Sequence, residues 1–344
     1  MKILIVGGGI AGLSTAIQLM EKGVSFTLID QGNNNSTRTA AGMINPIVFR
    51  RTTKSWRVDE FMPYLIKFYL NIEKVTTHSF LHPLKLRRIF SSEQERNEWL
   101  KKQLNTEYQP YLEEVTREDD GYDLVNTEYG TGRVKQCYWV DSETFMMASK
   151  QLISSENNII QERFQHEEYN PKLKIYKGDF YDKVIFCEGS DVKLNPLFAY
   201  LDIRSTKGQL LTISASDIPE VESFNRKCFV LPIGNEQFKI GSTYEWNATD
   251  TLPTNEGKQV ILDNFQVLTK KTPEILEHTA GIRPTTFDRR PFIGEHAEFK
   301  GNFIFNGLGT KGYMIAPLLS EELINHILHG SELHSEVLIE RVKN

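Results

Sequence analysis

The chain has 344 residues, enough to bury a large core and to form two domains. Hydrophobic residues make up 40% and charged residues 25%, as in an ordinary globular protein, and the formal net charge of -5 argues against a nucleic-acid partner. The three cysteines lie far apart without C-x-x-C spacing, so we expect neither a disulfide framework nor a metal site.

The sequence shows no pattern for export or membrane insertion. Residues 3–6 form the apolar run near the start, which is too short for a signal peptide and fits a first strand instead. No window approaches the 18 consecutive apolar residues of a membrane-spanning helix. We therefore expect a cytoplasmic protein without a membrane span.

The first thirty residues carry the strongest pattern in the chain. Residues 2–6 predict a strand, residues 13–22 an amphipathic helix, and residues 24–29 a second strand that ends on Asp30. This order of strand, helix and strand is typical of the first unit of a dinucleotide-binding domain.

Three glycines join the first strand to the helix, and they fit G-x-G-x-x-G. Gly7 permits the tight turn, Gly9 lets the backbone approach a pyrophosphate, and Gly12 lets the helix pack closely. The free N–H groups of the helix then bind the phosphates. Asp30, 18 residues after Gly12, stands where an acidic residue binds ribose hydroxyls. A turn without a ligand is the alternative, but the complete pattern favours a dinucleotide.

The next segment is polar at first and then rich in small residues. Residues 31–39 are polar and contain consecutive asparagines, so we expect a loop. Small side chains in residues 40–46 would let the backbone lie flat against a planar ligand, although a plain loop fits equally well. The basic residues that follow form either a solvated face or an anion-attracting rim; they are Arg50, Arg51, Lys54 and Arg57.

Short helices and strands fill the middle of the chain. The uninterrupted apolar run at residues 184–187 predicts a parallel strand covered on both faces, which belongs to the dinucleotide domain. Asp141 is expected to cap the helix that follows it. Helices are expected at residues 59–75, 93–104, 144–153 and 259–268, strands at residues 80–90, 137–140, 209–213, 228–232 and 237–243, and turns at Gly121, Gly130 and Gly132.

A second glycine-rich junction lies near the end of the chain. A strand at residues 302–305 leads through glycines at residues 306–312 into a helix of about sixteen residues, 313–328. The positive end of this helix suits an electron-rich ring that becomes anionic on reduction. Glu321 and Glu322 lie in the middle of the helix, and we expect both to face solvent.

These patterns predict an α/β fold, α+β overall, in which two domains are interleaved. The Rossmann-like nucleotide domain is expected to comprise residues 1–80, 136–203 and 278–344. A mostly antiparallel sheet is expected to form the substrate domain from residues 81–135 and 204–277.

Seven segments in the same order resemble the FAD-dependent D-amino-acid oxidase (DAO) family. Its members include glycine oxidase, sarcosine oxidase, D-amino-acid dehydrogenase and the flavin domain of a bacterial tRNA-modifying enzyme. The resemblance covers essentially the whole chain and implies an FAD-binding domain interleaved with a substrate domain. The segments are residues 7–19, 40–46, 183–190, 207–211, 232–243, 280–294 and 306–317.

The resemblance also implies where FAD binds. The first glycines would contact the pyrophosphate, Asp30 the adenosine ribose, residues 39–43 the isoalloxazine side, and residues 307–312 its N1–C2=O edge. No cysteine lies near Arg283, where some relatives attach the flavin, so FAD should be non-covalent. The cofactor-binding residues expected in this way are Gly7, Gly9, Ile10, Ala11, Gly12, Asp30, Gln31, Thr39, Ala40, Ala41, Gly42, Met43, Gly189, Arg283, Gly307, Leu308, Gly309, Thr310, Lys311 and Gly312.

The family chemistry transfers a hydride from the carbon that bears the amine to flavin N5, which depends on orientation more than on a side-chain acid–base pair. Arg283 matches the arginine that clamps the substrate carboxylate, although it could instead hold the turn before Pro284. Phe229 replaces a tyrosine, and Thr310 with Lys311 replaces a second arginine, so glycine is not a firm substrate. The expected catalytic residues are therefore Arg283, Lys311, Phe229 and Thr310. The basic cluster at residues 50–57 suggests that the substrate carries an additional anionic group.

The sequence thus predicts an FAD-dependent oxidoreductase that oxidises the C–N bond of an amino acid or an N-substituted amino acid. The electron acceptor is left open between O2 and a quinone or other carrier. One alternative is a tRNA-modification-type flavin domain that acts on a carboxymethylamino group; the acidic balance and the absence of a fused methyltransferase count against it. A non-catalytic FAD-binding module and an NAD-binding regulator are further alternatives.

Overall fold

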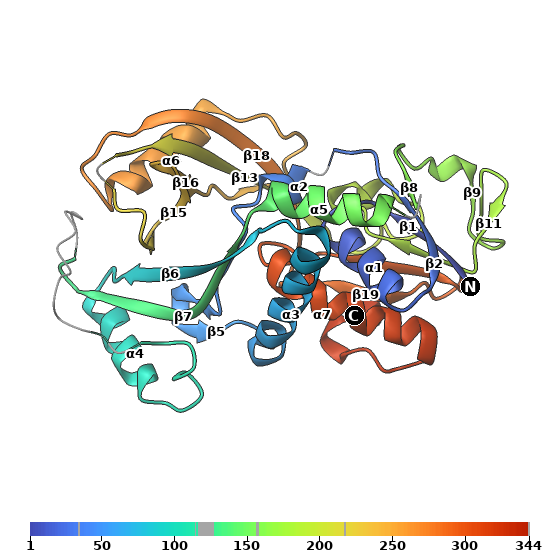
Figure 1. The fold of residues 1–344 in the computed structure, drawn as a ribbon, viewed down its shortest axis with the longest axis horizontal. Coiled ribbons are helices and arrows are strands. Elements are labelled where there is room, and N and C mark those ends of the chain that lie inside the picture. Colours follow the sequence, from blue (N-terminus) through green and yellow to red (C-terminus); the bar gives the residue numbers. More distant parts are fainter. Residues whose placement is uncertain (34, 114, 116–126, 156–157, 217, 343–344) are drawn as a thin grey trace.

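The computed structural model describes residues 1–33, 35–113, 115, 127–155, 158–216 and 218–342. Two large sheets lie in opposite halves of an elongated molecule (Figure 1). The labelled chain ends both lie in the half that contains the first strand. The predicted turn at Gly121 falls outside the described residues.

The first sheet is the predicted nucleotide-domain sheet, and its strands are parallel except at one edge. The buried strand β12 pairs with β1 on one side and with β20 on the other, as its uninterrupted apolar run predicts. The order is β19 (Phe292–Glu295), β20 (Asn302–Asn306), β12 (Lys183–Phe186), β1 (Lys2–Val6), β2 (Ser25–Ile29) and β8 (Ile159–Ile160), with β19 antiparallel.

Four helices pack on one another beside this sheet and bury the largest hydrophobic core. Helix α1 packs against α7 and α5, and α3 packs against the same two helices. The capping box predicts the start of α4, where the Ser92 hydroxyl accepts from the Glu95 N–H at 3.2 Å. These four helices are α1 (Ile10–Glu21), α3 (Val58–Thr76), α5 (Ser142–Ser154) and α7 (Gly312–His329), and the other helices are α2 (Asn35–Thr39), α4 (Glu93–Gln103) and α6 (Asn255–Gln266).

The second sheet is mostly antiparallel. Its long strands β13 and β18 pair over twelve positions, and β6 pairs with β7. The order is β17 (Glu245–Trp246), β13 (Ile203–Ser214), β16 (Gln237–Gly241), β15 (Phe229–Gly234), β14 (Ser223–Asn225), β6 (Leu81–Ile89), β7 (Thr131–Val140) and β3 (Met43–Ile44), with β18 (Glu274–Thr286) beside β13.

The remaining elements are short. Strands β4 (Ile47–Val48) and β5 (Thr53–Lys54) form a hairpin, and β9 (Tyr169–Asn170), β10 (Ile175–Tyr176) and β11 (Asp179–Phe180) form a small sheet. Short 3-10 helices lie at Phe49–Arg51, His166–Glu168, Gly189–Leu194, Ser335–Val337 and Ile339–Val342.

No helix in the described part of the chain combines the length and apolar character needed to cross a membrane.

The fold class is confirmed, but three local predictions are wrong. The expected loop at residues 31–39 contains α2, whose Thr37 hydroxyl bonds the start of α1. Gly132 lies inside β7 rather than in a turn, because the Trp99 ring occupies the space where a side chain would stand. Strand β18 was not predicted as a strand.

The predicted domain boundaries stay a proposal. Strand β7 crosses the boundary at residues 135 and 136, and β18 crosses the one at residues 277 and 278. The short strand β3 lies in the segment assigned to the nucleotide domain but pairs with β7 in the second sheet.

Candidate functional site

A cavity of about 830 Å³ lies where the two sheets meet. It extends from the start of α1 to β15 and β18, so it brings together residues from both ends of the chain. The predicted site residues that line it are Gly7, Gly9, Ile10, Ala11, Asp30, Gln31, Thr39, Ala40, Ala41, Gly42, Met43, Gly189, Phe229, Arg283, Leu308, Gly309, Thr310, Lys311 and Gly312. Gly12 and Gly307 are not among the lining residues.

The glycines at the start of α1 are required by close backbone contacts. A Cβ atom at Gly12 would lie 1.8 Å from the Gly7 carbonyl oxygen, and one at Gly7 would lie 2.5 Å from the Cys187 carbonyl oxygen. Gly7 also has a φ of +100°, which favours glycine. Gly9 has no side chain to cap the helix, and the Ile10 N–H donates to Thr37 Oγ1 at 3.1 Å. Gly9, Ile10 and Ala11 line the cavity, so the positive end of α1 faces it, as anion binding requires.

Asp30 is buried at the end of β2 and is held by two donors. Its carboxylate accepts from the Gly8 N–H at 3.3 Å and from Lys150 Nζ at 2.6 Å. A Cβ atom at Gly8 would lie 2.6 Å from Asp30 Cγ, so the glycine between Gly7 and Gly9 also serves this site. Lys150 comes from α5 and was not predicted as a site residue.

A loop that sequence reasoning missed forms one wall of the cavity near Asp30. Residues 162–167 line it, together with the turn that begins at Gly189. His166 contacts Glu188 at 2.8 Å, and Glu188 also accepts from the Asn195 amide at 2.6 Å. The loop at residues 162–167 has no regular hydrophobic periodicity, so the sequence pattern did not predict these residues as part of the site.

The start of α7 lies at the other end of the cavity. Its N-cap residue, Lys311, provides no side-chain cap, and the first turn contains no acidic residue. A Cβ atom at Gly307 would lie 2.6 Å from Thr286 Cγ2, so Gly307 serves packing. Two helix N-termini thus face one cavity, and both attract negative charge.

Arg283 projects from β18 and is surrounded by neutral groups. Its guanidinium donates to Ser242 Oγ at 3.0 Å and to the Thr243 carbonyl at 3.3 Å, and it lies 5.5 Å from the Tyr244 ring centroid. A Cβ atom at Gly208 would lie 1.9 Å from Arg283 Nη2. No carboxylate in the described part of the chain pairs with it, and burial lowers the pKa of Arg283.

A buried polar network fixes the segment that holds Arg283. Gln209 is fully buried, and its backbone N–H donates to Thr243 Oγ1 at 3.0 Å. Its side-chain amide donates to Glu245 at 2.6 Å and accepts from the Thr254 N–H at 2.8 Å. Every polar atom of the Gln209 side chain therefore has a partner, and the network restrains residues 242–245. Gln209 and Gly208 were not predicted as site residues.

The remaining predicted catalytic residues lie at the same end of the cavity. Phe229 is half-buried in β15 opposite Gly241, and Thr310 lies in the turn before α7. Lys311 Nζ donates to the Asn45 carbonyl at 3.0 Å and to Ser55 Oγ. Burial lowers the pKa of Lys311 to about 8.

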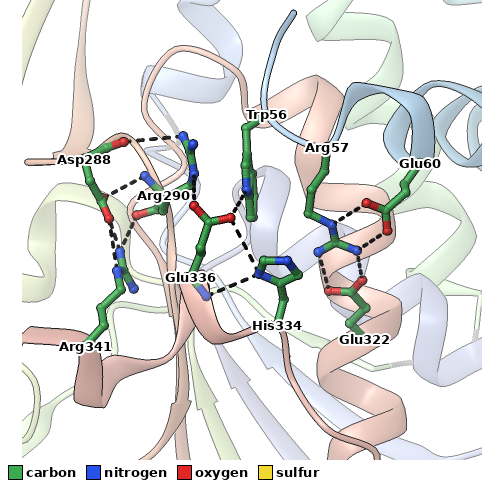
Figure 2. A network of polar contacts seen from close by, with 9 residues as sticks. All are labelled: Trp56, Arg57, Glu60, Asp288, Arg290, Glu322, His334, Glu336 and Arg341. Atoms are coloured by element: carbon green, nitrogen blue, oxygen red, sulfur yellow. Dashed lines mark hydrogen bonds and ion pairs between the residues drawn. The ribbon is translucent and has the colours of Figure 1, made fainter. Parts of the chain in front are cut away.

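The basic cluster that follows residue 46 does not line the cavity. Arg50 and Arg51 are exposed, and Lys54 pairs with Asp59. Arg57 pairs with Glu60 at 2.7 Å and with Glu322, as Figure 2 shows. Lys54 and Arg57 thus pair with carboxylates of the protein, and the role of the cluster as an anion-attracting rim stays a hypothesis.

The expectation that Glu321 and Glu322 face solvent is wrong. Both are partly buried, because α7 packs against α3 along this stretch. Glu322 accepts from the Arg57 guanidinium, and a neighbouring network ties Trp56 and Arg290 to Glu336 near the end of the chain (Figure 2).

Comparison with known proteins places these observations in a family. The model of the DAO family, described as FAD dependent oxidoreductase, matches residues 2–325. The chain is similar to glycine oxidase of Pseudomonas aeruginosa, with 24% identity over 96% of this chain and 95% of the relative. It is also similar to the tRNA 5-methylaminomethyl-2-thiouridine biosynthesis bifunctional protein MnmC of Marinobacter nauticus, with 24% identity over 99% of this chain but only 58% of the relative.

A solved structure agrees with this placement at the level of the fold. The crystal structure of glycine oxidase from Geobacillus kaustophilus superimposes with a TM-score of 0.82 at 17% sequence identity. The match covers 96% of this chain and 95% of that chain.

Proposed function

Because the chain belongs to the DAO family of FAD-dependent oxidoreductases, we propose that it oxidises the C–N bond of an amino acid or of an N-substituted amino acid. The similarity to a glycine oxidase over nearly the full length of both chains supports this substrate class. The substrate carboxylate would bind Arg283, and the carbon that bears the amine would lose a hydride.

The residues of the cavity fit FAD. The start of α1 and the carboxylate of Asp30 suit a pyrophosphate and a ribose, and residues 39–43 offer small side chains beside a planar ring. The open start of α7 suits the ring edge that becomes anionic. When bound, FAD supplies the acceptor for the hydride that leaves the substrate.

We propose that FAD binds without a covalent bond. The cysteine that lines the cavity is Cys187, which packs beneath the glycines at the start of α1, far along the chain from Arg283. Burial raises the pKa of its thiol, so it is a poor nucleophile.

One observation carries the proposal: Arg283 is a cavity-lining guanidinium without an anionic partner in the described part of the chain. Only neutral groups hold it, and burying a charge is costly unless an opposite charge meets it. A substrate carboxylate would provide that charge through two parallel hydrogen bonds. Phe229 adds no hydroxyl to this clamp, which leaves Arg283 as its main donor.

Arg283 variants test the proposal. In Arg283→Met, kcat/KM for the best amino-acid substrate should fall about 10- to 100-fold, the cost of one charge-assisted hydrogen-bonded contact. Arg283→Lys keeps the charge but loses the fork, and it should recover only part of the loss. The matched probe is the amine of the same substrate without its carboxylate, whose kcat/KM should not change. An equal loss for both probes would contradict the clamp.

The tRNA-modification alternative has one supporting observation, the similarity to MnmC along nearly the whole chain. The chain spans only a little more than half of that relative, so its full activity remains a proposal for this chain. Holoenzyme that no free amino acid reduces, but that a nucleoside with a carboxymethylamino group does reduce, would favour this alternative.

A further inference from the structure

Lys311 has an unusual set of hydrogen-bond partners for a lysine. Its Nζ donates to the Asn45 carbonyl at 3.0 Å and to Ser55 Oγ, and no carboxylate in the described part of the chain pairs with it. Both acceptors lie at the neck of the β4–β5 hairpin, which the Ser55 N–H closes onto the Pro46 carbonyl at 2.8 Å. The hairpin therefore fixes the amine in place.

The number of hydrogens on the amine gives these contacts a chemical meaning. A neutral amine has two N–H groups and one lone pair, whereas an ammonium has three N–H groups. The two acceptors use two N–H groups, and the fourth position on nitrogen remains. Lys311 is one of the residues that line the cavity, so this remaining position is the one available to a proton from a group there.

The surroundings of Lys311 permit both protonation states. Cys137 on β7 and Arg289 before β19 are the titratable or charged groups that act on it. Burial raises the pKa of the Cys137 thiol, so Cys137 stays neutral and adds no negative charge. Burial lowers the pKa of Lys311 to about 8, and Arg289 acts in the same direction.

Lys311 lies close to the proposed carboxylate clamp. The Gly309 N–H donates to the Pro284 carbonyl at 2.9 Å, and Leu308 forms a bridge with Thr285. The turn that carries Lys311 is thus paired directly with the strand that carries Arg283. A substrate whose carboxylate binds Arg283 would place its amino group at this end of the cavity.

We propose that Lys311 is the base that removes a proton from the substrate ammonium group, an inference that rests on the proposed function. An amino acid is mostly an ammonium ion at neutral pH, so its nitrogen has no free electron pair. In the proposed step an N–H bond of the substrate breaks, its electron pair stays on the substrate nitrogen, and a new N–H bond forms on Lys311 Nζ. The free pair then supports the C=N double bond as the hydride leaves, and Lys311 later returns the proton to water.

The first test is the pH dependence of anaerobic flavin bleaching in holoenzyme, with N-methylglycine and L-proline as probes at saturation. In the wild type the limiting rate should rise about tenfold per pH unit and level off near pH 8. In Lys311→Met the inflection near pH 8 should disappear and the limiting rate should fall, because no base is left beside the substrate to take the proton. Lys22→Met, which removes an exposed lysine at the C-terminal end of α1, is the control and should behave as the wild type.

A second readout needs no substrate. The visible spectrum of the bound oxidised flavin should change with a midpoint near pH 8, and the change should be absent in Lys311→Met. Ser55→Ala removes an acceptor that favours the charged amine, so it should move the midpoint to lower pH.

The outcomes separate the two proposals. If the flavin of Lys311→Met is bleached at the rates of the wild type and with the same pH midpoint, the role of Lys311 is overturned and the proposed function stays intact. The absence of a spectral midpoint would also overturn it. If no amino acid bleaches the wild type, the proposed function fails and this role fails with it.

Discussion

Gly208 and Arg283 show how one missing side chain can create a binding group. The guanidinium occupies the space that a Cβ atom at Gly208 would fill, with Tyr244 on its other side. Arg283 is thus held between backbone and ring rather than by an acid. A clamp built in this way stays available for a carboxylate from outside the protein.

Gly208→Ala should move Arg283 without unfolding the sheet. The new methyl group would meet the end of a flexible side chain, so the arginine shifts and KM for amino-acid substrates should rise about tenfold, with kcat changed less. Steady-state kinetics measures this. The control is Gly23→Ala, an open position with a φ of +65°, which should cost about 1 kcal/mol of stability but leave KM unchanged. An unchanged KM in Gly208→Ala would contradict the contact.

The buried charge of Lys311 should lower the free energy of unfolding of the protein. Its pKa lies near 8 instead of 10.5, so below pH 8 the folded protein bears the full cost of a charge that burial disfavours. Lys311→Met should therefore raise the free energy of unfolding by about 1–3 kcal/mol at pH 7. The gain should shrink between pH 8 and pH 10.5, where the unfolded lysine still binds a proton that the folded one has released.

Urea unfolding of flavin-free protein at pH 7 and pH 10 measures this difference. A gain that is equal at both values, or a loss at pH 7, would contradict the assignment of the pKa shift to burial.

At the residue scale, the sequence predicted positions whose role depends on near neighbours. Gly7, Gly9 and Asp30 stand in one strand–helix–strand unit, so their spacing alone places them together. Lys150 and Gln209 depend on contacts between distant segments, and no spacing marks them. Arg283 was predicted from a resemblance, but its support by Ser242 and Gly208 needed the structure.

At the element scale, polar sequence concealed regular structure. Strand β18 contains His278, Gly281 and Pro284, which do not alternate as a half-buried strand does, yet it pairs with β13 along its length. Tertiary pairing outweighs local propensity here. Helix α2 is short and polar, and its position under the start of α1 orders it.

The contact between α3 and α7 depends on an ion pair that the sequence did not suggest. Arg57 is partly buried and bonds both Glu60 and Glu322 (Figure 2). Glu322→Gln should lower the free energy of unfolding by about 1 kcal/mol, because it removes one of the two charges that compensate a partly buried guanidinium. Urea unfolding measures the loss.

The neighbouring residue provides the control for that variant. Burial and, after it, repulsion from Glu321 raise the pKa of the Glu21 carboxyl, so Glu321→Gln should be neutral or slightly stabilising. Equal losses of unfolding free energy in Glu322→Gln and Glu321→Gln would show that the contact between Arg57 and Glu322 does not itself stabilise the protein.

At the scale of the whole molecule, the prediction of interleaved domains was correct because two glycine junctions at opposite ends of the chain belong to one sheet. Strands β1 and β20 flank β12, so the starts of α1 and α7 meet at one cavity. Exact boundaries do not follow from the sequence, since β7 and β18 of the second sheet each continue across a predicted boundary.

The visible spectrum of the purified protein tests the central claim most directly. It should be recorded before and after anaerobic addition of D-, L- and N-methyl amino acids, and again in the supernatant after acid precipitation. We expect a yellow protein that one class of amino acid bleaches, with the colour released into the supernatant. A flavin that no amino acid bleaches would contradict the proposed reaction, and colour retained in the pellet would contradict non-covalent binding.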